Sequence, residues 1–294
     1  MSERRAYLEA AIVIVVWGGN YVVTKLAVAT VPPAAFVVWR FLLTAVVTAP
    51  WMVRDRPRSP AEWGKLAVLG LVGVAIYQYA FNVALKETLA ANVSVLFSMA
   101  PLLTVVGDGL LWGRGLGRRV WLGAGVGLVG VAVLVGGSFQ GRMTGELWAL
   151  TAAALWALFT ILTDRLRPAV RGLGQTGWMG LVGSLALLPG AGLYPIWRTG
   201  SGMVWVLFYV VVLVTVVGLS LWQRLVADLG SARTSFLLYV IPVVSSLLAW
   251  AVLGEAPTWR LALGALLVFT GVYVAERDRH GQISAPSASA SDPS

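Results

Sequence analysis

The chain alternates apolar runs of about twenty residues with short polar segments, and this alternation constrains its fold more than any other feature. A helix of that length crosses the roughly 30 Å hydrocarbon core of a bilayer. Only 12% of the 294 residues are charged and 58% are hydrophobic, whereas a soluble domain carries about 25% charged residues. The sequence therefore predicts an all-α membrane protein with lipid as the solvent of its outer surface.

Ten such runs are predicted to be transmembrane helices, because the strongest helix breakers fall between them. Pro32 and Pro33, Pro168 and Pro257 all separate neighbouring runs. The predicted spans are Leu8–Val28, Pro33–Trp51, Lys65–Leu85, Ala91–Leu111, Val120–Gly137, Gly145–Asp164, Gln175–Ile196, Val204–Gln223, Arg233–Leu253 and Trp259–Glu276. Residues 280–294 are rich in Ser, Ala and Pro and are expected to form a disordered C-terminal tail.

The basic residues predict the orientation of these spans. If the N-terminus is cytoplasmic, sixteen Lys and Arg residues fall on the cytoplasmic side and five on the outer side, and Arg40 inside a span completes the 22. Cytoplasmic loops carry such an excess of Lys and Arg. We therefore expect a protein of the bacterial inner membrane with both termini on the cytoplasmic side. The same distribution explains the net charge of +9 without a nucleic-acid partner.

The two halves of the chain resemble each other. A shift of 141 residues places Pro101 on Pro242, and a shift of 139 places Trp17 on Trp156. Each half holds five predicted spans, an odd number, so the halves are expected to insert in opposite orientations. The prediction is two inverted five-helix repeats, residues 1–137 and 138–279, with a substrate site near the midplane where the halves meet.

Several motifs resemble the EamA family of the drug/metabolite transporter superfamily. They are Trp17-Gly18-Gly19-Asn20-Tyr21, Trp39-Arg40-Phe41 and Leu253-Gly254-Glu255. The resemblance implies ten helices, a central cavity enclosed by spans 1–4 and 6–9, peripheral spans 5 and 10, and metabolite export. Within the family the chain is most similar to YddG-type exporters of aromatic and other neutral amino acids. It departs from the family pattern at Arg114, where the first repeat lacks a counterpart of Glu255.

Aromatic and polar side chains near the middle of the spans are candidates to line that cavity. Trp17 and Trp156 correspond through the repeat and lie away from the interfacial positions typical of membrane tryptophans. Aromatic rings with nearby amides and hydroxyls suit a small solute with an apolar body and a polar end. Packing between helices uses the same residue types, so both interpretations stand. The candidate substrate-binding residues are Trp17, Asn20, Tyr21, Gln78, Tyr79, Asn82, Ser98, Trp156, Thr160 and Tyr239.

We expect Trp17 and Trp156 to face each other across the cavity, joined by Tyr21, Gln78 and Tyr79. The mid-span prolines Pro101 and Pro242 free backbone carbonyls and are candidate gating hinges, although a bend that serves packing alone fits equally well.

Two intramembrane cations have more than one interpretation. Arg40 could bind a substrate carboxylate or brace helices by donating to carbonyls, and the resemblance to the EamA family favours the brace. Lys25 is expected to snorkel to the outer surface. No carboxylate is predicted near the midplane, which argues against a proton or cation antiporter of the small multidrug-pump type.

Together these features predict a secondary transporter that exports neutral or aromatic amino acids by alternating access. Other cargoes, such as a nucleobase or an amphipathic drug, remain alternatives, as do a channel, a receptor and a membrane-embedded enzyme. An enzyme is disfavoured because cysteine is absent and His280, the only histidine, lies in the tail. No cofactor or metal is expected; the partners are a small-molecule substrate and the bilayer. The pair Gly123 and Gly127, in a Gly-x-x-x-Gly pattern, is compatible with a homodimer.

Overall fold

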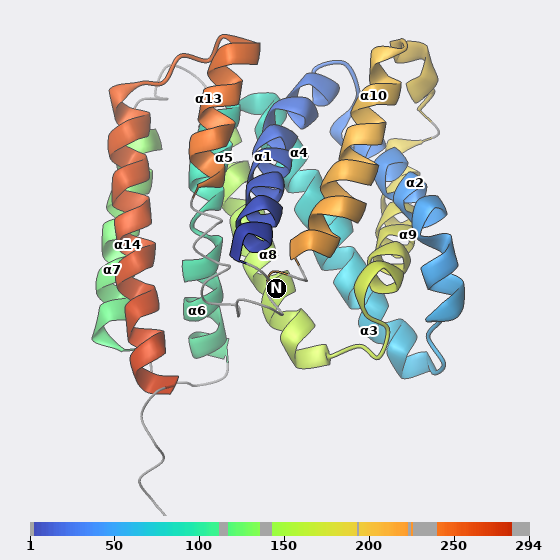
Figure 1. Ribbon diagram of the computed structural model, residues 1–294, viewed down its shortest axis with the longest axis horizontal. Coiled ribbons are helices and arrows are strands. Elements are labelled where there is room, and N and C mark those ends of the chain that lie inside the picture. The colour runs from blue at the N-terminus through green and yellow to red at the C-terminus, as the bar shows by residue number, and fades with distance from the viewer. Residues whose placement is uncertain are drawn as a thin grey trace, which may run out of the picture.

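The computed structural model describes residues 3–111, 117–135, 143–192, 194–222, 225 and 240–283, and their regular structure is helical throughout (Figure 1). Three predicted spans are built from consecutive pieces. The helices are α1 (Glu3–Val28), α2 (Pro33–Arg54), α3 (Pro60–Gly70), η1 (Leu71–Ile76), α4 (Tyr77–Glu87), α5 (Ala90–Phe97), α6 (Ala100–Leu111), α7 (Arg118–Val135), α8 (Met143–Leu166), α9 (Gly172–Ala191), η2 (Ile196–Thr199), α10 (Gly202–Phe208), η3 (Tyr209–Gly218), α13 (Ile241–Leu253) and α14 (Trp259–Ile283).

The chain is a multi-pass membrane protein, as predicted. Within the described residues six helical stretches are long and apolar enough to cross a membrane: Tyr7–Val28, Pro33–Arg54, Pro60–Glu87, Ala90–Leu111, Met143–Leu166 and Gly202–Trp222. The other four predicted spans coincide with the shorter or less apolar helices α7, α9, α13 and α14. Large apolar side chains on the outer surface, such as Val15, Val129 and Trp205, are exposed and suit contact with lipid.

Several predicted span boundaries differ from the helices, and α14 continues to Ile283, so residues 280–283 of the predicted tail are helical. Two of the differences have a reason in local chemistry. The third span begins at Pro60 rather than Lys65, because the Ser59 hydroxyl accepts a hydrogen bond from the Glu62 amide at 3.2 Å and Pro60 occupies the first helical turn. The seventh span ends at Ala191 rather than Ile196. Gly192 follows it with a φ of +60°, a backbone conformation that ends the helix.

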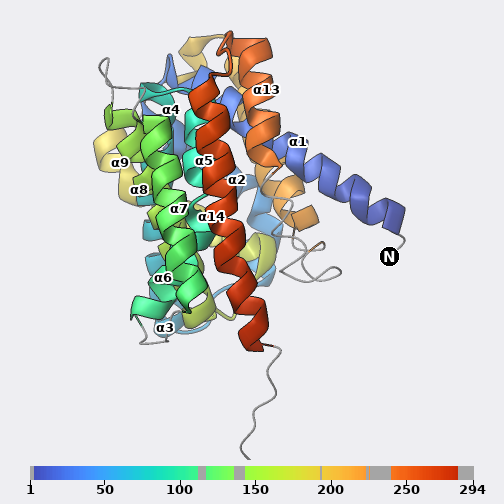
Figure 2. The same ribbon diagram turned by 90° about the vertical axis from the view of Figure 1, so that its left-hand side faces the viewer.

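Helices of the two halves pack in reciprocal pairs. At one edge of the molecule α7 lies beside α14, and at the opposite edge α2 lies beside α9 (Figures 1 and 2). Between these edges α1 packs against α13, and α8 packs against α5 and α6. Each contact has a counterpart five predicted spans further along the chain. In Figure 1, α1 runs upward from the N-terminus, whereas its counterpart α8 runs downward towards α9.

The third and eighth spans share an irregularity that supports the duplication. Each contains a π-helical segment, η1 and η3, and a shift of 141 residues carries η1 into η3. In η3 the Thr215 hydroxyl donates to the Val210 carbonyl, five residues earlier, at 2.8 Å. Because π-helical turns often occur at functional sites, they direct attention to the region between these two spans.

Glycines let α7 and α14 pack closely against each other within one chain. A Cβ atom at Gly130 would lie 2.7 Å from the Val268 amide nitrogen and 2.9 Å from the Gly264 carbonyl oxygen of α14. A Cβ atom at Gly271 would overlap the backbone of Gly123 and Gly127. The Gly-x-x-x-Gly pair therefore serves packing of α7 on α14, and the homodimer inferred from it gains no support.

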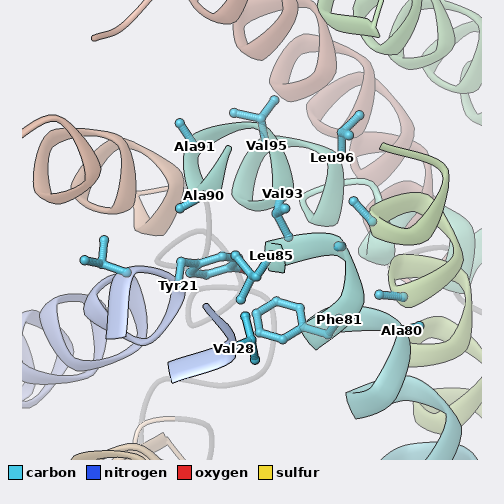
Figure 3. Close-up of a cluster of buried hydrophobic side chains, with 14 of the residues drawn as sticks. Tyr21, Val28, Ala80, Phe81, Leu85, Ala90, Ala91, Val93, Val95 and Leu96 are labelled. Atoms are coloured by element: carbon cyan, nitrogen blue, oxygen red, sulfur yellow. The ribbon is translucent and has the colours of Figure 1, made fainter. Parts of the chain in front are cut away.

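The largest apolar core includes residues of most helices, and Figure 3 shows the part of it between α1, α4 and α5. Tyr21 of α1 points toward Phe81 of α4, with Leu85 beside them and Val93 and Leu96 of α5 above. The small Ala80, Ala84, Ala90 and Ala91 allow these helices to approach closely. This core positions the aromatic residues of the candidate site.

Candidate functional site

Six aromatic side chains form a connected group, which we call the aromatic cluster: Tyr21, Tyr77, Phe81, Phe97, Trp156 and Phe159. Tyr77 is central, because its ring centroid lies 5.2 Å from that of Trp156, 5.8 Å from Phe97 and 6.0 Å from Phe81. Phe81 extends the group to Tyr21 at 5.3 Å, and Trp156 extends it to Phe159 at 5.5 Å. These separations are typical of interacting aromatic pairs. The cluster joins α1, α4 and α5 of the first half to α8 of the second.

Helical spacing explains why these residues meet. Tyr77 and Phe81 are four residues apart on α4, and Trp156 and Phe159 are three apart on α8, so each pair shares a face. Thr160, one residue beyond Phe159, is exposed, and its hydroxyl donates to the Trp156 carbonyl at 2.8 Å. The structure therefore brings Tyr21 and Trp156 into one cluster, and Thr160 is exposed one turn after Trp156 on α8.

Tyr79 was predicted to lie beside Trp156, but its ring neighbour is Trp148. Tyr77 packs against Trp156 instead. Tyr79 is 36% exposed, and its ring lies 6.0 Å from that of Trp148. Two residues along a helix turn the side chain by about 200°, so Tyr77 and Tyr79 cannot share a face. The four-residue spacing of Tyr77 and Phe81 was the signal that could have identified the correct tyrosine.

Trp17 occupies a place equivalent to Trp156 but has different neighbours. Its indole nitrogen donates to the Val214 carbonyl of η3 at 3.2 Å, and its ring lies 5.2 Å from that of Trp222. A Cβ atom at Gly218 would lie 2.5 Å from that nitrogen, so the glycine makes room for the indole. Trp17 thus packs on the eighth span, as Trp156 packs on the third. Tyr239, another predicted site residue, lies outside the described residues.

Three buried polar side chains near the cluster have unsatisfied atoms within the described part of the chain. Arg40, Gln78 and Asn82 are 4%, 9% and 0% exposed. The Asn82 amide nitrogen donates to the Gln78 carbonyl at 2.6 Å. Arg40 Nε and Nη1, Gln78 Oε1 and Asn82 Oδ1 have no hydrogen-bond partner there. The site therefore offers buried donors on α2 and buried acceptors on α4.

Two other predicted polar residues are satisfied locally. The Asn20 side-chain oxygen accepts a hydrogen bond from the Thr24 hydroxyl at 3.2 Å, one turn later on α1. The Ser98 hydroxyl donates to the Ser94 carbonyl at 3.0 Å. Both side chains already have partners within their own helices.

The two prolines lie at helix starts rather than inside continuous helices. The fourth span is interrupted at Ser98 and Met99, and Pro101 follows as the second residue of α6. Pro242 is the second residue of α13. Pro101 has no amide hydrogen to donate to the Phe97 carbonyl, which accounts for the break between α5 and α6. A hinge role for either proline stays a prediction.

A network of polar contacts, which we call the closing network, joins helices of both halves at the face opposite the N-terminus. Lys25 Nζ lies 3.4 Å from Glu255 Oε1 and donates to the carbonyls of Leu85, at 3.1 Å, and Thr88. Glu255 Oε2 accepts from the Ala90 amide at 2.9 Å. Lys25 is therefore held by protein groups at this face, and its side chain keeps 23% exposure.

The second half contributes another carboxylate to the closing network. Glu146 of α8 is buried, and its Oε1 accepts from the Thr88 hydroxyl at 2.5 Å and from the Asn92 amide at 3.3 Å. Sequence reasoning overlooked Glu146 because it lies at a span end. Its position one residue inside the predicted sixth span was the available signal.

The helical fold and the sequence comparisons together define a multi-pass membrane transporter, not an enzyme. The chain belongs to the EamA-like transporter family of the drug/metabolite transporter superfamily: the family profile matches residues 4–136 and again residues 143–276. The two matches confirm the resemblance seen in the motifs and the duplication of the chain.

Relatives and a solved structure agree with this assignment. The chain is 30% identical over 292 residues to a protein of Salmonella typhimurium named "Probable amino-acid metabolite efflux pump", covering 93% of this chain and 95% of that protein. It is 28% identical over 249 residues to a "Probable terminal-alkyne amino-acid exporter" of Streptantibioticus cattleyicolor, covering 81% and 80%. A crystal structure with 25% identity superposes with a TM-score of 0.62, covering 93% of this chain and 98% of that one.

Proposed function

We propose that this transporter exports neutral amino acids, aromatic ones in particular, by alternating access between its two halves. The observation that carries the proposal is the aromatic cluster on α4 and α8, adjoined by the unsatisfied amides of Gln78 and Asn82. Aromatic rings favour an apolar side chain, and buried amide oxygens favour the ammonium group of an amino acid. The names of two relatives, which describe amino-acid export, point to the same class of cargo.

The proposed architecture is ten spans in two inverted repeats, residues 1–137 and 138–279, in a bacterial inner membrane. The antiparallel course of α1 and α8 and the reciprocal helix pairs support the inversion (Figure 1). In Figure 2 the end of α14 lies at the lower face, and α1 slopes down from the upper face towards its start. The excess of Lys and Arg in the loops of the lower face favours a cytoplasmic location for both termini.

A nucleobase or an amphipathic drug would also stack on the aromatic cluster. A drug without matching polar groups would leave both the Arg40 donors and the amide acceptors unpaired, and a neutral nucleobase would leave the Arg40 charge unbalanced. An unpaired buried polar group costs about 1–3 kcal/mol. The free donors and acceptors therefore favour a zwitterion.

Uptake of labelled phenylalanine, methionine and threonine into proteoliposomes tests the proposal, with protein-free liposomes as the control. We expect saturable uptake of at least phenylalanine, and faster uptake when unlabelled phenylalanine is present on the opposite side. A channel would show no such trans-stimulation. If the wild-type protein moves none of the three amino acids, the proposed cargo is wrong, while the assignment to the family is unaffected.

A further inference from the structure

Arg40 is a buried cation whose charge the described protein groups do not balance. Its side chain contacts the Thr215 hydroxyl through Nη2 at 3.5 Å, the outer limit of a hydrogen bond. That hydroxyl already donates to the Val210 carbonyl. Within the described part of the chain, Nε and Nη1 have no partner and no carboxylate forms an ion pair with the guanidinium.

A helix brace does not account for this environment. A buried ion is retained at a cost of several kcal/mol unless hydrogen bonds and an opposite charge compensate it. A bracing arginine would donate to carbonyls of neighbouring helices, as Lys25 does to Leu85 and Thr88. Arg40 makes one long contact instead, and its guanidinium lies 5.3 Å from the Phe41 ring centroid. The structure thus favours carboxylate binding, the interpretation that the family resemblance disfavoured.

We propose that Arg40 binds the carboxylate of the transported amino acid. An ionised carboxylate supplies both the missing charge and acceptors for the unpaired N–H groups, and Arg–carboxylate pairs are among the strongest protein hydrogen bonds. The inference rests on the proposed function, since it assigns one end of that cargo to a residue.

The position of Arg40 suits a solute that carries a carboxylate close to an aromatic side chain. Helix α2 packs against α4, the helix that carries Tyr77 of the aromatic cluster. Thr215, the other neighbour, belongs to the π-helical segment of the eighth span. Arg40 therefore lies between the two irregular segments η1 and η3, beside the cluster that would receive the side chain of the solute.

The amide oxygens supply the complementary pole. Gln78 Oε1 and Asn82 Oδ1 lie one turn apart on α4 and accept no hydrogen bond from described residues. An ammonium group donates three hydrogen bonds, and these oxygens would accept two of them. Donors from α2 and acceptors from α4 together match a zwitterion rather than a simple amine or a simple acid.

The test compares phenylalanine with phenylalaninamide, which differ in the carboxylate alone, in proteoliposomes that hold wild-type protein, Arg40→Gln or Arg40→Lys. Wild-type protein is expected to take up phenylalanine at least about tenfold faster than phenylalaninamide. Arg40→Gln should lose about tenfold of phenylalanine uptake and little of phenylalaninamide uptake. Arg40→Lys keeps the charge but lacks the planar guanidinium. Its ratio of phenylalanine uptake to phenylalaninamide uptake should fall between those of the wild-type protein and Arg40→Gln.

The ratio of the two rates does not depend on how much protein is folded, so it separates binding from bracing. An unchanged ratio in Arg40→Gln would overturn the proposal, whether both rates fall together or neither falls. If Arg40→Gln does not insert, the ratio of Arg40→Lys decides in the same way. Wild-type protein that transports neither compound would contradict the proposed function as well, whereas wild-type transport with an Arg40-independent ratio contradicts the Arg40 assignment alone.

Discussion

At the scale of single residues, the aromatic cluster depends on a few side chains that the sequence identified in part. Tyr21 and Trp156 were predicted from depth and symmetry, and both contact the cluster. Arg40 was noticed for its charge, but its missing partners were visible in three dimensions alone. Sequence spacing shows which residues share a helix face. It does not show which neighbouring helix that face meets, and this is why Trp17 and Trp156 were expected to face each other.

Trp156→Ala is expected to reduce phenylalanine transport about tenfold, because it removes ring contacts worth about 0.5–1.5 kcal/mol each. The matched control is Trp148→Ala, on the same helix, where the indole is 36% exposed and contacts Tyr79. Initial uptake rates per reconstituted protein measure the difference. Equal rates in the two variants would show that Trp156 is a packing residue.

At the scale of elements, the sequence predicted where helices occur and missed how they are interrupted. Each of the ten predicted runs contains helix within the described residues, since each must satisfy its backbone hydrogen bonds within lipid. The π-helical segments η1 and η3 were not predicted, because one extra residue in a turn leaves the apolar pattern intact. The break before Pro101 was anticipated as a bend, because proline has a definite chemical signature.

The packing of α7 on α14 leads to a prediction about stability. Gly130→Leu should destabilise the protein by about 1–3 kcal/mol, because a side chain there would collide with the backbone of α14. Gly125→Leu is the matched control, on the same helix, with no atom within 4 Å of the added Cβ. Thermal unfolding in detergent compares the two. A Gly130→Leu variant as stable as Gly125→Leu would contradict the close approach of these helices.

At the scale of the whole molecule, the repeat and the loop charges were readable from sequence, and the charges predict that both termini are cytoplasmic. A periplasm-active phosphatase fused after Arg279 should be inactive, and one inserted between Gly137 and Thr144 should be active, because the basic loops are expected to stay in the cytoplasm. Colorimetric assays on whole cells measure both. The reverse pattern would overturn the proposed orientation.

The closing network joins both halves at one face, so alternating access requires its contacts to break. Glu255→Gln keeps an acceptor for the Ala90 amide but removes the charge that pairs with Lys25. The loss should favour the conformation open at this face by about 1 kcal/mol, which corresponds to about a fivefold change in population. Ser94→Cys, a buried position on α5, supplies the reporter, since the chain has no other cysteine.

We expect a membrane-impermeant maleimide, added from the side of the closing network, to label Ser94→Cys about fivefold faster in the Glu255→Gln background. Glu62→Gln is the matched control. Glu62 also pairs with a lysine, Lys65, at 2.7 Å and accepts from a backbone amide, that of Ala169, at 2.7 Å, but at the opposite face. Glu62→Gln should leave the labelling rate unchanged or lower it. Weakening the face that holds Glu62 and Lys65 favours the conformation in which the face of the closing network is closed. Equal acceleration by both variants would indicate general loosening of the fold, and acceleration by neither would show that the Lys25–Glu255 pair does not hold the face closed.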